Sequence, residues 1–322
     1  MIYDQWALAF NLLTVAVLAF IVANLVVSSI FWFVKGKLAD YAVSTRKSLL
    51  WLFVLTPWGI ALSVTLFFSP LFQANAAFVW LTKLAHWHHP DIFNFLSWHS
   101  VSLFVFIAFS LTVLTKKMRV LYQNHHQIRL LRALGTKKNE QVIIIESSIP
   151  TAFTGGVVKP SCFISTALIE QTSADELAII IQHELAHVHY CDPLKKWLFS
   201  FFSAYFTNHV KRLLISMMSL SMEQDADSFF IKNQQQSHNV ASTLLKFTKL
   251  AANYSIHQQY NSELLVHFCR HSLEQRVLHL LNDQQFKPFP KGGVLLAILL
   301  LALISTTSVD SIHHVIETLF TH

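Results

Sequence analysis

The chain has 322 residues, of which 53% are hydrophobic and only 13% are charged. A soluble domain carries about 25% charged residues, so this composition excludes an ordinary soluble protein and indicates a membrane protein. The formal net charge of +6 comes without a recognisable nucleic-acid-binding motif, so we assign the excess to cytoplasmic loops and expect no direct nucleic-acid binding.

Four apolar segments are predicted to cross the membrane. The first has no charged residue between Trp6 and Val34 and exceeds the roughly 20 residues that a helix needs to cross the hydrocarbon core. It does not resemble a signal peptide, because no Lys or Arg precedes it and the apolar run is too long. We expect spans at residues 6–34, 49–72 and 92–114, and a shorter fourth span at residues 292–309.

Basic residues predict the orientation of these spans. They gather after the first span, after the third and before the fourth: Lys35, Lys37, Arg46, Lys47, Lys116, Lys117, Arg119, Lys287 and Lys291. The positive-inside rule then places the N-terminus outside, with three spans in residues 1–115. Residues 116–291 are predicted to form a cytoplasmic domain. Residues 310–322 then form a short outer tail. The expected location is a bacterial-type inner membrane, with both ends of the chain outside.

The predicted cytoplasmic domain begins with strands and continues with helices. Residues 141–148 predict a short strand, and residues 154–165 predict a glycine turn followed by another. A helix starts at Thr172 or Ser173, either of which can cap it, and ends near Asp192 and Pro193. Two apolar runs, 197–210 and 213–222, are too short to span. They predict either a hairpin against the domain and the inner membrane face, or two ordinary core helices.

The sequence HELAH, residues 183–187, lies in the middle of this helix. His183 and His187 are four residues apart, so a helix presents both imidazoles on one face, where they can bind one metal ion. Glu184 is rotated by about 100°, which suits a general base for the attacking water better than a ligand. Two histidines that are only hydrogen-bonded on a core helix would give the same motif. A third candidate ligand is therefore needed to favour a metal site.

The sequence MEQDAD, residues 222–227, offers that third ligand. If it is helical, Glu223 and Asp227 share a face and Asp225 points away. Glu223 would complete the two histidines and one carboxylate typical of catalytic zinc. Asp227 would accept the free N–H of a ligand histidine and fix its tautomer. The alternative is a solvated acidic helix end, which the preceding apolar run disfavours because unpaired carboxylates are costly in apolar surroundings.

With these motifs the chain resembles the beta-lactam sensor-transducers of the BlaR/MecR type, which are antirepressor metallopeptidases of the membrane. HExxH followed by ExxxD is the pattern of gluzincin-type membrane peptidases, and three spans before the domain with one after it match the layout of the sensors. Gly156 and Pro160 in FTGGVVKPSCFIS match a further family segment. Asp192 in HELAHVHYCDPL matches another.

The resemblance implies both a fold and a chemistry. The fold is a mainly α membrane protein with four transmembrane helices and an inserted α+β gluzincin-type zinc protease domain. The implied site is one catalytic Zn²⁺ bound by His183, His187 and Glu223, with Glu184 as general base. A weaker similarity of RHSLEQRV to related membrane proteases implies that His271 or Arg276 stabilises the oxyanion or holds substrate. A structural helix start with a salt-bridged arginine fits that segment equally well.

The chain departs from the pattern of these sensors on the predicted outer side. The sensors of this family carry a large extracellular penicillin-binding domain after the last span, where this chain has DSIHHVIETLFTH, so we expect no direct beta-lactam sensing. Histidines gather on the predicted outer side: His86, His88, His89, His99, His313, His314 and His322, with Asp91. They could bind metal or sense pH, but interfacial polar residues beside the belt tryptophans are the favoured interpretation.

The sequence thus predicts a zinc metalloendopeptidase that cleaves a protein on the cytoplasmic side, with a transcriptional repressor as the candidate substrate. Two alternatives remain open. The first is a protease for membrane-protein quality control or for processing lipidated proteins. The second is a non-proteolytic transducer with a structural metal, which the presence of Glu184 disfavours because a structural site needs no base. The expected partners are a protein substrate and the lipid bilayer, and the sequence does not indicate an oligomeric state.

Overall fold

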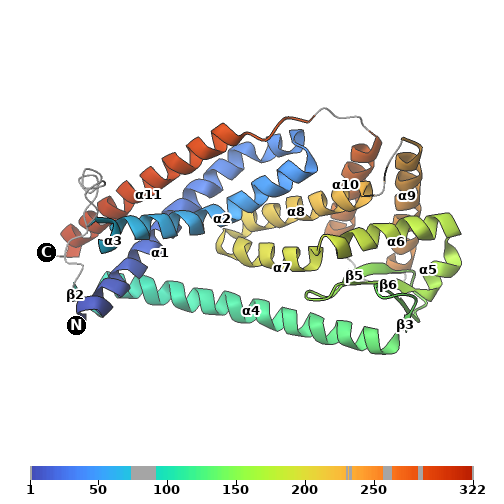
Figure 1. Cartoon of the computed structure of the whole chain (residues 1–322), viewed down its shortest axis with the longest axis horizontal. Coiled ribbons are helices and arrows are strands. Elements are labelled where there is room, and N and C mark those ends of the chain that lie inside the picture. The colour runs from blue at the N-terminus through green and yellow to red at the C-terminus, as the bar shows by residue number, and fades with distance from the viewer. Residues whose placement is uncertain are drawn as a thin grey trace.

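The computed structural model describes residues 2–73, 92–229, 231, 234–256, 263–281 and 286–320. Within this part the chain is mainly helical. Four helices are long and apolar enough to cross a membrane: α1 (Asp4–Val34), α2 (Val43–Phe68), α4 (Trp98–Leu134) and α11 (Lys291–Phe320). They mark the chain as a membrane protein, and the start of α1 and the end of α11 lie at the same end of the molecule (Figure 1).

The long helices differ from the predicted spans mainly at their ends. The second begins at Val43, ends at Phe68 and is followed by the short α3 (Pro70–Gln73). The third begins only at Trp98, because Ile92 and Phe93 form β2, which pairs antiparallel with β1 (Ile2–Tyr3). Both α4 and α11 continue well past residues 114 and 309. Charged residues end a membrane span but not a helix, since Lys and Arg are good helix formers.

A four-stranded sheet follows α4, in the order β3–β4–β6–β5. Its strands are β3 (Thr136–Lys137), β4 (Val142–Ile145), β5 (Ala152–Gly155) and β6 (Ser161–Ser165). β4 and β6 are parallel, whereas β3 and β5 are antiparallel to their neighbours. The predicted strands at 141–148 and in 154–165 correspond to β4 and β6. β5 is an edge strand, and its open edge borders the candidate site.

Helices complete the domain. They are α5 (Thr166–Gln171), α6 (Ala174–His189), α7 (Asp192–Phe202), η4 (Ser203–Tyr205), α8 (Asn208–Ser228), α9 (Gln234–Ile256) and α10 (Glu263–Leu281). A further short helix, η1 (Lys35–Asp40), connects α1 to α2. The sheet lies between α6 and the far end of α4 (Figure 1). A small core of its own joins the sheet to α5 and α6, through Val142, Cys162, Ile164, Leu168 and Ile180.

The two apolar runs at 197–210 and 213–222 do not belong to that small core. They form α7, η4 and α8, whose buried side chains, among them Phe199, Leu214 and Met218, share one large core with α1, α2 and α11. At the turn between α7 and α8, the Tyr205 ring lies 5.6 Å from Phe20 of α1 and 4.9 Å from Trp58 of α2, centroid to centroid. Both partners are several turns from the ends of their helices, so the hairpin packs deep among the candidate spans.

Candidate metal centre

The helix that carries HELAH begins as its sequence predicts. The Ser173 side chain accepts a hydrogen bond from the Glu176 backbone, and the Glu176 carboxylate accepts one from the Ser173 backbone, so the pair forms a capping box. The helix, α6, runs from Ala174 to His189 and places His183 and His187 on one face. It ends before Asp192 rather than at it, and α7 starts there.

Glu223 on α8 lies opposite the two histidines. Its Oε2 is 3.4 Å from His183 Nε2, and its Oε1 is 3.7 Å from His187 Nε2. One donor atom from each of the three side chains lies within 4.8 Å of the other two, which is compact enough for a single metal ion. The structure therefore brings together the three residues that the sequence predicts as ligands, although α6 and α8 are separated by the whole of α7.

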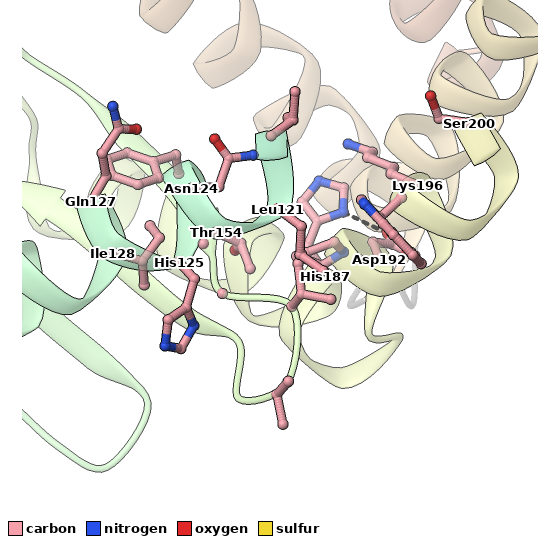
Figure 2. Close-up of a pocket in the computed structure, with 18 of the residues that line it drawn as sticks. Leu121, Asn124, His125, Gln127, Ile128, Thr154, His187, Asp192, Lys196 and Ser200 are labelled. Atoms are coloured by element: carbon pink, nitrogen blue, oxygen red, sulfur yellow. Dashed lines mark hydrogen bonds and ion pairs between the residues drawn. The ribbon is translucent and has the colours of Figure 1, made fainter. Parts of the chain in front are cut away.

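Each histidine is held from behind by a buried carboxylate. His183 Nδ1 lies 2.9 Å from Asp227 Oδ1, and His187 Nδ1 lies 2.7 Å from Asp192 Oδ2, the contact drawn as a dashed line in Figure 2. With Nδ1 occupied in this way, each ring points Nε2 towards the other two donors. This carboxylate–histidine arrangement fixes the tautomer that a metal ligand needs, so the residues fit a metal ion.

The role of Asp192 depends on the chain between α6 and α7. Cys191 has φ 53° and ψ 40°, a left-handed conformation that turns the chain sharply. The turn starts α7 at Asp192 and brings the carboxylate back to His187 on the preceding helix. Sequence reasoning matched Asp192 to a family segment but assigned it no contact, because the helix period does not extend across such a break.

Arg276 on α10 binds Asp227 with two parallel hydrogen bonds. Its Nε lies 2.7 Å from Oδ2 and its Nη2 lies 2.6 Å from Oδ1. The Asp227 side chain is only 1% exposed, so it needs such partners. Arg276 Nη1 also lies 3.5 Å from Glu223 Oε2. The arginine thus links α10 to both acids of α8. His271 lies on the same helix, but its side chain is outside the described part of the structure.

The charges of this cluster balance one another. Burial lowers the pKa of His183, but hydrogen bonds to Asp227 and Glu223 outweigh burial and raise that pKa to about 10. Burial raises the pKa of Glu223, yet hydrogen bonds from His183 and His187 outweigh burial and hold it well below its usual range. In the metal-free protein His183 therefore holds a proton, and a metal cation bound by this ring would displace it.

Glu184 is almost fully buried, and its carboxylate contacts the sheet while it lines a cavity together with Glu223. Thr154 of β5 lies with its hydroxyl oxygen 2.8 Å from Glu184 Oε2 and 2.8 Å from the Glu184 carbonyl oxygen. The hydroxyl can donate to the carboxylate and so orient it. Burial and the nearby Glu184 raise the pKa of Cys162 on β6 to about 12.

A cavity of about 810 Å³ opens beside these residues. Figure 2 shows Leu121, Asn124 and His125 of α4 facing Thr154 of β5 and His187 of α6 across it. Glu184 and Glu223 also line it, and α7 contributes Lys196 and Trp197. The part of α4 beyond residue 114, which the hydropathy pattern did not predict, therefore forms one wall. A smaller cavity of about 230 Å³ lies on the α9 side and shares Glu184 and Glu223.

Two side-chain contacts join α8, the helix that carries Glu223, directly to α2. Arg46 Nη1 donates to Gln224 Oε1 at 2.8 Å, and Lys47 pairs with Asp225. These partners are the two residues that follow Glu223. Gln224 also donates from Nε2 to the Gln275 carbonyl oxygen at 3.2 Å, next to Arg276. The position of Glu223 is thereby tied both to the start of α2 and to α10.

Of the histidines predicted to lie on the outer side, the structure describes the side chains of His99 and His314. His86, His88, His89 and His322, with Asp91, lie outside the described residues, as does the side chain of His313. His99 is at the start of α4, where its ring stacks on Trp98 at 4.0 Å between centroids. His314 Nε2 lies 3.8 Å from Asp310 Oδ1 on the same helix.

Removing the carboxylate behind His187 should weaken metal binding. We expect Asp192→Asn, and likewise Asp227→Asn, to lower metal affinity by about 10–100-fold, because each histidine loses the negatively charged acceptor that fixes its tautomer and the amide can also turn its NH₂ group towards the ring. Chelator competition on the purified protein measures this. Asp175→Asn is the matched control, since that carboxylate is exposed in the first turn of α6, and it should bind metal like the wild type. Wild-type affinity in Asp192→Asn would mean that packing alone orients His187.

The four candidate membrane helices and the three metal-binding side chains are together typical of a membrane metallopeptidase. The chain belongs to the BlaR1 peptidase M56 family, whose model matches residues 15–280. That match covers most of α1, all of α2 and α4, and every residue of the metal cluster, so it confirms the family that the motifs predicted. No curated protein matches the chain.

Proposed function

We propose that this protein is a zinc metalloendopeptidase that cleaves a protein on the cytoplasmic side of the membrane. The observation that carries the proposal is the compact donor set of His183, His187 and Glu223, with Glu184 beside it on the wall of an open cavity. Two imidazoles and one carboxylate leave a coordination position open, which is typical of catalytic rather than structural zinc.

The residues around the site have separable tasks. A zinc ion held there would act as a Lewis acid towards the peptide carbonyl and lower the pKa of a water molecule. Glu184, oriented by Thr154, would accept a proton from the attacking water and deliver it to the leaving amine. Arg276 is held on Asp227 by both of its hydrogen bonds, so we assign it to positioning His183 through that acid rather than to the oxyanion.

The edge strand β5 suits an extended peptide. It borders the cavity through Phe153, Thr154 and Gly155, and its one partner in the four-stranded sheet is β6. An extended chain can add to such an edge with backbone hydrogen bonds. A peptide lying there would pass Thr154, which contacts Glu184, so its scissile bond would come close to the base.

The proposed substrate is a transcriptional repressor. This part of the proposal rests on the family, whose resemblance implies antirepressor activity, and on the basic residues that favour a cytoplasmic site. The test is capture of partners on the Glu184→Gln variant in cells, by crosslinking from Asn124 in the cavity wall. A captured DNA-binding protein that the wild type then cleaves would support the proposal. Captured membrane proteins alone would favour quality control.

Orientation has an independent test. We expect a cytoplasm-active reporter to function when fused at positions within residues 116–291, because the basic residues flanking this segment keep it inside. A periplasm-active reporter should function when fused after Asp310. The reverse pattern would place the metal centre outside and exclude a repressor as substrate.

A further inference from the structure

A second cavity lies among the membrane helices, separate from the metal centre. Its volume is about 260 Å³, and none of its lining residues lines either cavity at the site. It is bounded by α1, α2 and the start of α11, whose contributions include Val27, Ile30, Phe53, Val294 and Leu301. Three helices thus enclose an apolar space that their own side chains do not fill.

The polar side chains of this cavity lie towards one end. Lys37 and Tyr41 come from η1 and the residue after it, at the cytoplasm-facing ends predicted for α1 and α2. The Thr56 hydroxyl is used within its own helix, where it donates to the Leu52 carbonyl oxygen at 2.6 Å. The cavity is therefore apolar along its length and carries a cation at the end nearest the membrane surface.

Lys37 differs from the lysines around it. Lys287 is paired with Asp40 at 2.7 Å, and the ammonium of Lys35 lies 3.3 Å from the centre of the Trp32 ring. Lys37 is exposed, and within the described part of the chain it has no ion pair or hydrogen bond. Its charge is thus available to an anion at the cavity mouth.

We propose that this cavity holds an acyl chain of an anionic glycerophospholipid whose phosphate group pairs with Lys37. An apolar slot that ends at a lysine near the membrane surface is complementary to a molecule with an apolar chain and an anionic head. A partner's transmembrane helix does not fit, because a helix with side chains is about 10–12 Å across and this space is closed on three sides. The proposal does not depend on proteolysis.

Two adjacent glycines allow a matched test. Gly293 lines the cavity and Gly292 does not. A Cβ atom at either position would have no neighbouring atom within 4 Å, so larger side chains are tolerated at both. In the first turn of α11, Gly293→Leu should occupy the cavity, whereas Gly292→Leu should leave it open.

The experiment is native mass spectrometry of the full chain released from vesicles of phosphatidylglycerol and phosphatidylcholine in equal amounts. We expect the wild type to retain one phosphatidylglycerol, with a preference over phosphatidylcholine of about fivefold, the contribution of one lysine near an anionic surface. Lys37→Gln should remove the preference and Gly293→Leu should remove the retained lipid. Lys35→Gln and Gly292→Leu should behave like the wild type.

Two results would overturn the proposal. The first is lipid retention by Gly293→Leu equal to that of Gly292→Leu, which would place the lipid elsewhere. The second is equal retention of the two lipids by the wild type, which would show that Lys37 does not select an anionic head group. Neither readout involves peptide cleavage, so a failure here leaves the proposed enzymatic function untouched.

Discussion

The variant Glu184→Gln is expected to lose proteolysis while it keeps its metal. Glutamine has nearly the same shape and can still accept the hydrogen bond from Thr154, but it cannot take a proton from water. The rate of peptide cleavage should fall by about 10²–10⁴-fold, the usual contribution of a general base. Metal content, measured on the same purified sample, should be unchanged because none of the three donors is altered.

Glu170→Gln provides the control for this experiment. Glu170 is exposed on α5 and contributes nothing to the cavity, so its substitution should leave both cleavage and metal content as in the wild type. Turnover of Glu184→Gln equal to that of the control would refute the proposed base. It would also return the non-proteolytic transducer to consideration, since Glu184 is the feature that argues against it.

A substitution of Glu223 should remove metal binding as well as peptide cleavage. Glu223→Ala removes one of the three donors and leaves Lys196 and Arg276 without the carboxylate that both approach. Metal affinity should fall by more than the roughly 10–100-fold expected for a supporting carboxylate, and cleavage should disappear with it. Metal content after dialysis and cleavage of a fluorescent peptide measure the two losses.

Glu274→Ala is the matched control, because Glu274 is an exposed carboxylate on α10 near the same end of the molecule. It should retain metal and activity. Full metal occupancy in Glu223→Ala would show that the third ligand is another group, with Asp227 the first to be tested. Loss of metal with an intact fold, judged by circular dichroism, would support the assigned donor set.

The sequence predicted those site residues whose relation is local. His183, Glu184 and His187 follow from one helix period, and Glu223 and Asp227 follow from another. The structure agrees with both periods. It also shows why Asp225 is separate, since the residue predicted to point away from the metal pairs with Lys47 of α2.

The contacts that sequence reasoning missed cross breaks or long separations. Thr154 belongs to β5, a strand that ends at Gly155 and whose last two residues were predicted as the start of a turn. Arg276 was predicted, from a family resemblance, to serve the oxyanion or substrate, with a structural salt bridge as the equal alternative. Its partner Asp227, 49 residues earlier in the chain, cannot be derived from periodicity. Arg46 and Gln224 are 178 residues apart, and their contact depends on how α8 packs against α2.

Hydropathy located the membrane helices but not the full length of α4. The apolar signal ends near residue 114, whereas the helix continues to Leu134 and supplies a wall of the cavity. Hydropathy reports where lipid surrounds a helix, and it carries no information on where the helix itself stops. The same limit applies to α11, which extends to Phe320.

The placement of α7 and α8 among the membrane helices has a practical consequence. Residues 116–291 cannot be cut out as a water-soluble enzyme, because excision would expose Phe199, Leu214 and Met218, which are buried against α1 and α2. It would also strip Gln224 of its contact with Arg46. The bilayer segments thus serve as the scaffold on which the metal site is assembled, and any treatment that loosens them should disorder Glu223 before it unfolds the sheet.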